Sequence, residues 1–312
     1  MEIRNLGQSG LRVSSIGLGC NNFGGRIDDA VTKAVIHKAL DLGITLFDTA
    51  DVYGERGGSE TLMGRILGEN RKRIVLATKF GMPMDDTGEK QGAARRYIMK
   101  AIEDSLRRLQ TDYIDLYQMH QTDPRTPIEE SLRALDDLVR QGKVRYVGCS
   151  NFPAWQMVDA AWTAKTSGLN AFVSCQDEYS LVHRDPEAQL LPAARRLGLG
   201  LLPYFPLASG LLSGKYRRNV ALPEGTRLAS TQRLADRYLT DRNWIITEKL
   251  GDFVQSRGRT MLELAFSWLL AQAPVASVIA GATRPEQLEQ NVKAGAWHLT
   301  SDDLAEINRL TA

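Results

Sequence analysis

Short apolar runs of strand type recur along this chain at intervals of about 30 residues, and an amphipathic run of helical type follows most of them. The runs at 74–77 and 277–280 are continuously apolar, which is typical of strands buried on both faces of a parallel sheet. Eight strand–helix units in 312 residues favour a (β/α)8 barrel, the TIM-barrel fold, over a doubly wound sheet. The predicted strands end near Gly19, Asp48, Lys79, His120, Cys149, Cys175, Tyr204 and Ala280.

The predicted helices carry clear start and stop signals. Isoleucines and leucines recur at helical spacing within residues 95–110. Pro127 begins and Gly142 ends the next helix, while Asp29 opens and Gly43 closes the first. These signals support the alternation of strands and helices.

Two segments fall outside the repeat. Residues 1–13 predict a short hairpin that plugs the amino-terminal end of the barrel. Residues 205–242, after the seventh strand, are predicted to be a long polar loop, and a loop of that length is usually functional. No linker divides the chain, which predicts a single domain over residues 1–312.

The composition excludes several classes of function. The 39 basic and 37 acidic residues give a formal charge of +2, which is too small and too evenly spread for a nucleic-acid surface. Three cysteines without C-x-x-C spacing indicate a reducing cytoplasm, and four scattered histidines lack metal-ligand spacing. Neither a signal peptide nor a membrane span is evident. We therefore expect a soluble cytoplasmic protein without metal, membrane or nucleic-acid binding, and its oligomeric state stays open.

Four titratable side chains fall at the ends of neighbouring predicted strands, where a barrel brings catalytic groups together. A lysine ammonium about 4 Å from a phenol favours the phenolate by roughly 4 kcal/mol at a dielectric of about 20, or at most about three pKa units before burial opposes it. Tyr53 is thus the predicted general acid, with its pKa lowered by Lys79. Asp48 would keep Lys79 charged and in position. His120 would donate a hydrogen bond to a substrate oxygen.

The later strands offer groups suited to a hydride donor. The polar side chains of residues 150–151 and Gln176 suit a nicotinamide carboxamide, and Tyr204 could stack on the ring. Residues 207–215 supply small side chains and backbone N–H groups that could surround a pyrophosphate. Residues 281–285 open a helix after the last strand, the usual place for a phosphate.

Several short motifs follow one another in a specific order. They are Gly17-Leu-Gly19, Asp48-Thr-Ala-Asp-Val-Tyr53-Gly, Ala77-Thr-Lys79-Phe-Gly, Asp115-Leu-Tyr-Gln-Met-His120, Gly148-Cys-Ser150-Asn151, Gln176, Tyr204-Phe-Pro-Leu207, and Gly281-Ala through Gln287 to Asn291. Together they resemble the aldo-keto reductase superfamily in its prokaryotic type, from about Leu6 onward. The absence of a G-x-G-x-x-G fingerprint agrees with a cofactor site on a barrel. Phe205 departs from the small residue that often follows the stacking aromatic in the family.

The resemblance implies a barrel that reduces aldehydes and ketones with NADPH, with Tyr53 as the acid, tuned by Lys79 and Asp48, while His120 orients the carbonyl. The implied cofactor-binding residues are Gly19, Cys20, Asn21, Ser150, Asn151, Gln176, Tyr204, Phe205, Leu207, Ser209, Gly210, Lys215, Arg227, Gly281, Thr283, Arg284, Gln287, Gln290 and Asn291. Residues near the expected substrate pocket mix apolar and amide side chains, which suits small or medium aldehydes, including sugar-derived ones: Asn22, Phe23, Phe80, Met82 and Gln121.

Three cationic candidates (Lys215, Arg227 and Arg284) favour NADPH over NADH, because a 2′-phosphate needs positive partners.

Two functional alternatives remain open beside the reductase. One alternative is a regulatory or redox-sensor subunit that binds NADP(H) with negligible turnover. The other is a Schiff-base lyase that uses Lys79 as its nucleophile.

Overall fold

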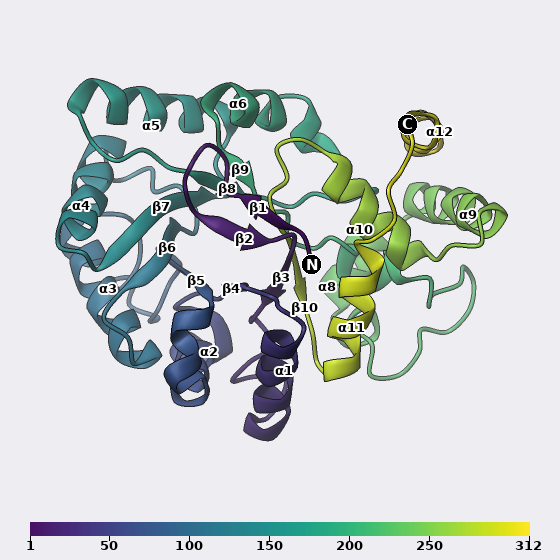
Figure 1. The fold of residues 1–312 in the computed structure, drawn as a ribbon, viewed down its shortest axis with the longest axis horizontal. Coiled ribbons are helices and arrows are strands. Elements are labelled where there is room, and N and C mark those ends of the chain that lie inside the picture. The colour runs from purple at the N-terminus through teal and green to yellow at the C-terminus, as the bar shows by residue number, and fades with distance from the viewer.

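Eight short parallel strands curl into a barrel in the computed structural model, which describes residues 1–312 (Figure 1). The sheet order is β10-β3-β4-β5-β6-β7-β8-β9. Backbone hydrogen bonds from Leu201 to Pro274 and from Ala276 to Leu201, both 2.9 Å, close the ring between β9 and the segment before β10. The predicted (β/α)8 barrel is confirmed. The strands are β3 (Ile16–Gly19), β4 (Leu46–Asp48), β5 (Val75–Phe80), β6 (Ile114–Met119), β7 (Val144–Ser150), β8 (Ser174–Gln176), β9 (Gly200–Leu201) and β10 (Val278–Gly281).

Helices surround the strands, and their ends follow the local sequence signals. Asp28 caps the first helix by accepting a hydrogen bond from the N–H of Val31, and Pro127 precedes the fourth. A capping box between Thr260 and Glu263 begins the helix before the last strand. The surrounding helices are α1 (Asp29–Asp41), α2 (Tyr53–Leu67), α3 (Arg95–Leu109), α4 (Ile128–Arg140), α5 (Ala154–Ser167), α6 (Leu190–Leu197), α10 (Met261–Ala271) and α11 (Pro285–Ala294).

The amino-terminal hairpin closes one end of the barrel. Strands β1 (Ile3–Asn5) and β2 (Arg12–Ser14) pair antiparallel and lie across the middle of the ring (Figure 1). Leu6 and Val13 are fully buried and pack with residues that point inward from the strands. The predicted plug is therefore present. We call the inward-pointing apolar set the interior layer: Leu6, Val13, Leu46, Ala77, Leu116, Leu202, Ala276 and Ile279.

The segment after β9 is a long insertion, as predicted for residues 205–242, but it contains short helical pieces, while residues 214–226 have no helix or strand. The seventh barrel strand also ends at Leu201 instead of Tyr204, which forms only an isolated bridge to Glu178. Apolar residues such as Leu211 and Leu228 are buried and hold this segment against the barrel. It contains a 3-10 helix η3 (Ala208–Ser213), α7 (Arg227–Ser230) and α8 (Gln232–Tyr238).

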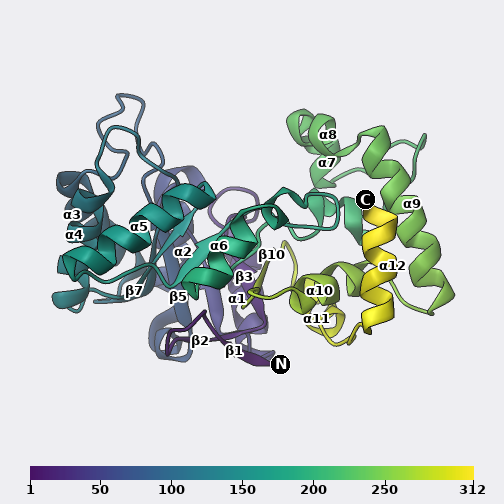
Figure 2. The ribbon, with the colours of Figure 1, turned by 90° about the horizontal axis from the view of Figure 1, so that it is seen from above.

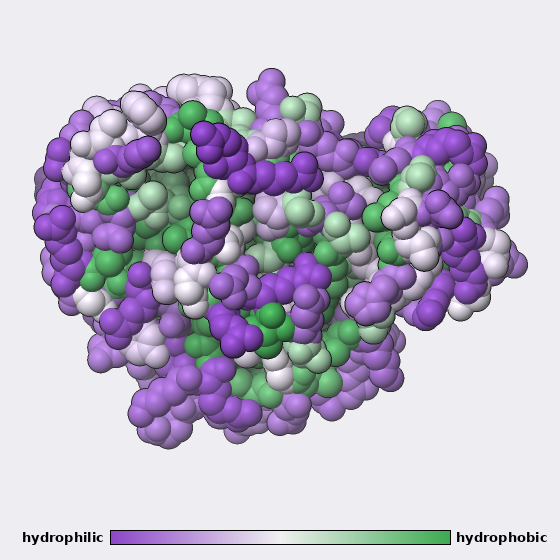
Figure 3. Space-filling model, turned by 45° about the horizontal axis from the view of Figure 1, so that its top comes forward, coloured by the Kyte–Doolittle hydropathy of each residue, from purple (hydrophilic) through white to green (hydrophobic).

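Two longer helices extend this side of the molecule. Helices α9 (Asp241–Ser256) and α12 (Ser301–Thr311) lie side by side, with α7 and α8 nearby (Figure 2). An ion pair of 2.7 Å between Arg257 and Asp303 joins them. On the face shown in Figure 3, hydrophilic residues dominate the outline and hydrophobic residues show mainly towards the middle. None of the helices combines the length and apolarity that crossing a membrane requires.

Candidate active site

Asp48, Lys79 and Gln118 point into the barrel because side chains alternate along a strand. Each stands two positions beyond a residue of the interior layer and thus on the same face of its strand. The parallel register places Lys79 beside Gln118. All three side chains are buried at the carboxyl end of the ring, where barrel enzymes place catalytic groups.

A buried ion pair forms the centre of this polar layer. Lys79 Nζ donates to Asp48 Oδ2 at 2.6 Å and to the backbone oxygen of Thr49 at 2.9 Å. The other Asp48 oxygen accepts from Gln176 Nε2 at 2.9 Å and Gln118 Nε2 at 3.3 Å. Burial alone would lower the pKa of Lys79, but Asp48 and the nearby phenol outweigh it and raise that pKa above its ordinary value. Lys79 is therefore an ammonium near neutral pH.

Tyr53 is the first residue of α2, whose next four residues form a non-helical turn, and it lies beside both Lys79 and His120. Its ring centre is 5.1 Å from Lys79 Nζ and 5.7 Å from the His120 ring, which it meets edge-on at 82°. Burial raises the pKa of the Tyr53 hydroxyl above its ordinary value and outweighs the opposing effect of Lys79. Lys79 does favour the phenolate, as expected, but burial is the larger effect, so the net shift of the pKa is upward. The phenol is protonated near neutral pH and can donate.

His120 is neutral in this site. Its backbone N–H donates to the carbonyl of Phe80 at 2.9 Å, and its backbone oxygen accepts from Asn151 Nδ2 at 2.9 Å. Burial, together with the charge of Lys79, lowers the pKa of His120 to about 3. Its Nδ1 is buried without a hydrogen-bond partner. A neutral imidazole carries one ring N–H, which can donate a hydrogen bond to a carbonyl oxygen.

The four side chains predicted to bind nicotinamide form one hydrogen-bonded chain. Tyr204 Oη donates to Asn151 Oδ1 at 2.7 Å, and Asn151 Nδ2 donates to Ser150 Oγ at 3.0 Å. Ser150 Oγ donates to the backbone oxygen of Gln176 at 2.7 Å, and Gln176 reaches Asp48. Asn151 has a φ of 57°, a conformation that asparagine tolerates better than most residues. The chain therefore leads from the rim of the barrel to the buried ion pair.

The remaining cofactor candidates lie on two segments at the same end. Gly19 and Gly281 are register partners on β3 and β10, which brings residues 19–22 next to the segment that begins α11. A side chain at Gly281 would come within 3.2 Å of Asn21 Oδ1. Cys20 is buried with its pKa raised well above the ordinary range by burial, so it is no reactive thiol. Arg284 immediately precedes α11, and this helix carries Gln287, Gln290, which is exposed, and Asn291, which is buried. The side-chain oxygen of Gln287 accepts a hydrogen bond from the N–H of Thr283 at 2.7 Å.

The other segment surrounds η3. Leu207 precedes η3, and Ser209 and Gly210 have φ values of 56° and 102°, so the backbone turns sharply there. Ser209 Oγ is buried and has no hydrogen-bond partner. The Arg227 guanidinium stands 5.2 Å above the Phe205 ring. Each of the three predicted phosphate cations lacks a carboxylate ion pair: Lys215, Arg227 and Arg284.

The candidate substrate residues differ in exposure. Phe23 and Phe80 are fully buried, and Phe80 stacks on Tyr117 with ring centres 4.7 Å apart. Asn22 is also buried and donates to the backbone oxygen of Ala282 at 3.2 Å. Met82 is half-buried and Gln121 is exposed. Of the five, only these two present appreciable surface to solvent.

Sequence reasoning missed two buried polar residues of this region. Gln118 donates to Asp48 and lies two positions before His120, so strand alternation could have placed it in the interior. Gly148 leaves room for it, because a Cβ there would lie 3.2 Å from Gln118 Cγ. Asp51 lies in the loop after β4 but is only 1% exposed. No local pattern marks that burial.

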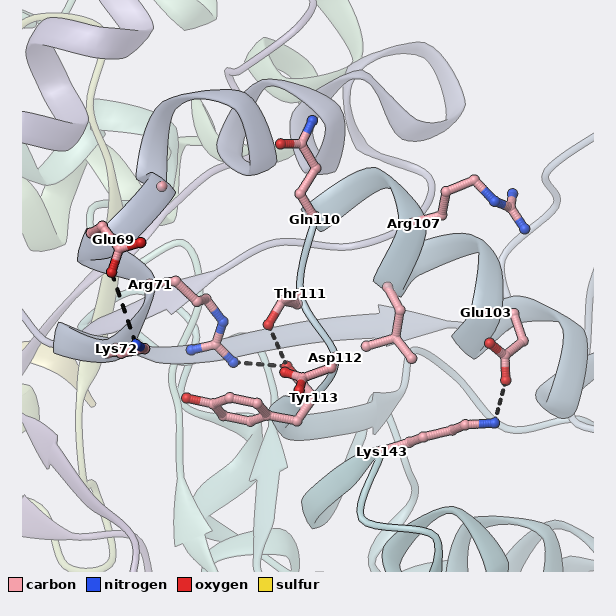
Figure 4. Close-up of a pocket in the computed structure, with 12 residues that line it drawn as sticks. Glu69, Arg71, Lys72, Glu103, Arg107, Gln110, Thr111, Asp112, Tyr113 and Lys143 are labelled. Atoms are coloured by element: carbon pink, nitrogen blue, oxygen red, sulfur yellow. Dashed lines mark hydrogen bonds and ion pairs between the residues drawn. The ribbon is translucent and has the colours of Figure 1, made fainter.

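A hollow of about 790 Å³ lies away from these residues, at the amino ends of β5 and β6 (Figure 4). Its charged groups are largely paired: Arg71 with the neighbouring Asp115 at 2.8 Å, and Lys143 with Glu103 at 2.5 Å. Arg71 also stacks on Tyr113 at 4.3 Å. We therefore place the candidate active site at the opposite end, where the buried titratable groups converge.

The fold and the site define a class of protein: a (β/α)8 barrel that can transfer protons at the carboxyl ends of its strands. An ion-paired lysine lies there beside a tyrosine and a neutral histidine. Comparison with known proteins narrows this class, because the sequence model of the aldo/keto reductase family matches residues 15–312. The chain belongs to the aldo/keto reductase family.

Three similar proteins show the range of the relatives. An uncharacterized oxidoreductase, YrpG, from Bacillus subtilis (strain 168) is 39% identical over 99% of this chain and 95% of its own length. The L-glyceraldehyde 3-phosphate reductase of Escherichia coli O157:H7 is 35% identical, over 99% and 92%. A probable voltage-gated potassium channel subunit beta from Arabidopsis thaliana is 36% identical, over 94% and 91%. Oxidoreductases thus match along nearly the whole chain.

Proposed function

We propose that this protein reduces aldehydes or ketones to alcohols with NADPH, and that Tyr53 is the general acid. The observation that carries the proposal is the placement of a protonated phenol between the Lys79 ammonium and the His120 imidazole, all at one end of the barrel. The family membership and the relatives named as oxidoreductases support the reaction class. The free, buried cysteines agree with a reducing cytoplasm.

The residues divide the work between proton transfer and orientation. Tyr53 gives its proton to the carbonyl oxygen as negative charge develops there. Lys79 stabilises the phenolate left behind, because it remains charged beside Asp48. His120 is neutral and donates a hydrogen bond to the same oxygen, which orients the carbonyl.

The residues present fit a nicotinamide dinucleotide. Tyr204 and the amides of Asn151 and Gln176 would hold its nicotinamide end, and the cofactor would supply a hydride to the carbonyl carbon. The unpartnered hydroxyl of Ser209 and the cation of Arg227 suit its phosphates. Three candidate cations without carboxylate partners favour NADPH over NADH for the same reason.

The test is oxidation of NADPH, followed by absorbance, across aldehydes, ketones and sugar aldehydes, with Tyr53→Phe as the matched control. We expect turnover with at least one carbonyl and a loss of about 10² or more in the Tyr53→Phe variant. A variant as active as the wild-type chain would contradict the assignment of the acid. Fluorescence titration compares the cofactors, and equal affinity for NADH and NADPH would contradict the preference.

A second candidate function is a regulatory or sensor subunit that binds NADP(H) and turns over negligibly. It is supported by the similarity to proteins named as probable potassium channel beta subunits. Turnover distinguishes it: tight NADPH binding without oxidation above the Tyr53→Phe control would favour the sensor. The Schiff-base lyase is disfavoured because the ion pair with Asp48 keeps Lys79 protonated, and an ammonium is no nucleophile.

A further inference from the structure

A second buried ion pair lies behind the active site, on the outer face of β5. Thr78 points away from the barrel interior because it neighbours the inward-pointing Lys79. Thr78 Oγ1 donates to Glu60 Oε1 at 2.5 Å, and Arg108 Nε donates to Glu60 Oε2 at 2.7 Å. The Glu60 side chain has no exposed surface and that of Arg108 is 22% exposed. The pair therefore joins β5, α2 and α3 in a region with little solvent.

Arg108 also packs beneath the turn that carries Tyr53. Residues Gly54, Glu55 and Arg56 have φ values of 66°, 59° and 67°, a left-handed run that is unfavourable for the two side-chain-bearing residues. Gly57 follows at 119°, and a Cβ there would lie 2.8 Å from Arg108 Cδ. A strained backbone of this kind persists only where its surroundings fix it.

The preceding part of the turn is fixed to the catalytic strand. The N–H of Asp51 donates to the backbone oxygen of Lys79 at 3.1 Å, and the N–H of Tyr53 donates to the carbonyl of Ala50 at 3.1 Å. Beyond Tyr53, Gly54 packs on the backbone of Phe23 and Gly24, and the turn ends at Gly57, which packs on Arg108. Tyr53 is thus held between an attachment to β5 and the Glu60–Arg108 pair.

We propose that Glu60 and Arg108 are positioning residues for Tyr53. Their ion pair fixes the left-handed turn and thereby sets where the phenol lies relative to Lys79 and the substrate oxygen. A buried pair often adds little net stability compared with apolar residues of similar volume, so geometry is the better reason for its presence here. The proposal rests on the proposed function for its catalytic consequence, and its structural consequence stands separately.

The decisive variant is the double substitution Glu60→Leu with Arg108→Met, which removes both charges and leaves none unpaired in the interior. We expect kcat to fall by about 10–10²-fold, because displacing a catalytic group by about 1 Å has an effect of that size. The Kd for NADPH should stay within about twofold, because the predicted cofactor residues lie on other segments. The matched control is Arg133→Met, which removes an exposed pair of 2.6 Å with Glu129 on α4 and should change neither quantity.

Hydrogen exchange measured by mass spectrometry tests the turn without turnover. We expect backbone amides of residues 53–59 to exchange at least tenfold faster in the double variant than in the wild-type chain, while peptides from α9 and α12 stay unchanged. Unchanged exchange in residues 53–59 would overturn the proposal, and so would uniformly faster exchange, which indicates general loosening. A wild-type chain that oxidises no NADPH would refute the reductase assignment, and the exchange experiment would still decide whether the pair positions the turn.

Discussion

Replacing Lys79 with methionine tests the buried ion pair at the centre of the site. The Nζ–Oδ2 distance of 2.6 Å corresponds to an attraction of about 6 kcal/mol at an effective dielectric of about 20, and desolvation of both ions opposes it. Removing one partner leaves the Asp48 carboxylate uncompensated, which typically costs about 3–5 kcal/mol. Asp48 keeps its bonds from Gln118 and Gln176, which stabilise the folded state but leave the charge in place. We therefore expect Lys79→Met to lower the free energy of unfolding by about 3–5 kcal/mol.

Urea denaturation followed by tryptophan fluorescence measures this loss. The double variant Lys79→Met with Asp48→Asn removes the uncompensated charge, so it should recover about 2 kcal/mol or more relative to the single variant. Lys100→Met is the matched control, because Lys100 pairs with Asp104 at the same 2.6 Å but its side chain is 58% exposed. The control should cost less than about 1 kcal/mol. Additive losses in the double variant, within about 0.5 kcal/mol, would refute the coupling of the two buried charges.

Further predictions address stability elsewhere in the molecule. Burial raises the pKa of Asp51, so the folded chain retains a proton that the unfolded chain releases above about pH 4. Asp51→Asn should therefore become progressively more stable than the wild-type chain as the pH rises above about 4, at up to about 1.4 kcal/mol per pH unit. Asp136 should show the opposite trend, because its hydrogen bonds and ion pair outweigh burial and lower its pKa. Asp136→Asn should be less stable than the wild-type chain above about pH 4, and the difference should close as the pH falls. Denaturant titrations at several pH values would contradict this reasoning if the stability differences of the two variants changed with pH in the same direction. Gly64→Ala should destabilise the fold by about 2 kcal/mol or more, because its Cβ would lie 2.3 Å from a backbone oxygen of α3. Gly251→Ala on α9 meets nothing within 4 Å and should stabilise the fold by about 0.5–1 kcal/mol. Thermal melts that show equal stability for the two variants would exclude the steric explanation. Leu6→Ala should cost about 2–5 kcal/mol, because Leu6 is fully buried in the interior layer, and a loss below 1 kcal/mol in urea would show that the hairpin does not fill the barrel.

The positions of the catalytic candidates could be predicted because they follow the apolar strand runs. Asp48 and Lys79 end such runs, and a barrel brings the ends of neighbouring strands together. The sign of the Tyr53 pKa shift could not be predicted, since it depends on how much burial the fold imposes against the nearby charge.

The helical content of residues 205–242 was missed for a different reason. Helices as short as α7 and α8 are unstable alone and form because buried residues such as Leu228 and Leu234 pack against the rest of the protein. The burial of Asp51 and Glu60 likewise depends on contacts between separate elements, and no spacing rule in the sequence reveals it.

The hairpin that plugs the barrel also constrains the order in which the protein can fold. Its residues leave the ribosome before the barrel strands do, yet Leu6 packs in one cluster with Leu202 and Ile279, and the N–H of Gln8 donates to the carbonyl of Gly198 at 2.8 Å. Contacts between residues so far apart in sequence form slowly, because the chain between them must first be ordered. The amino terminus must therefore wait until nearly all of the barrel has been synthesised, and during that time its apolar side chains remain available to chaperones or to other chains.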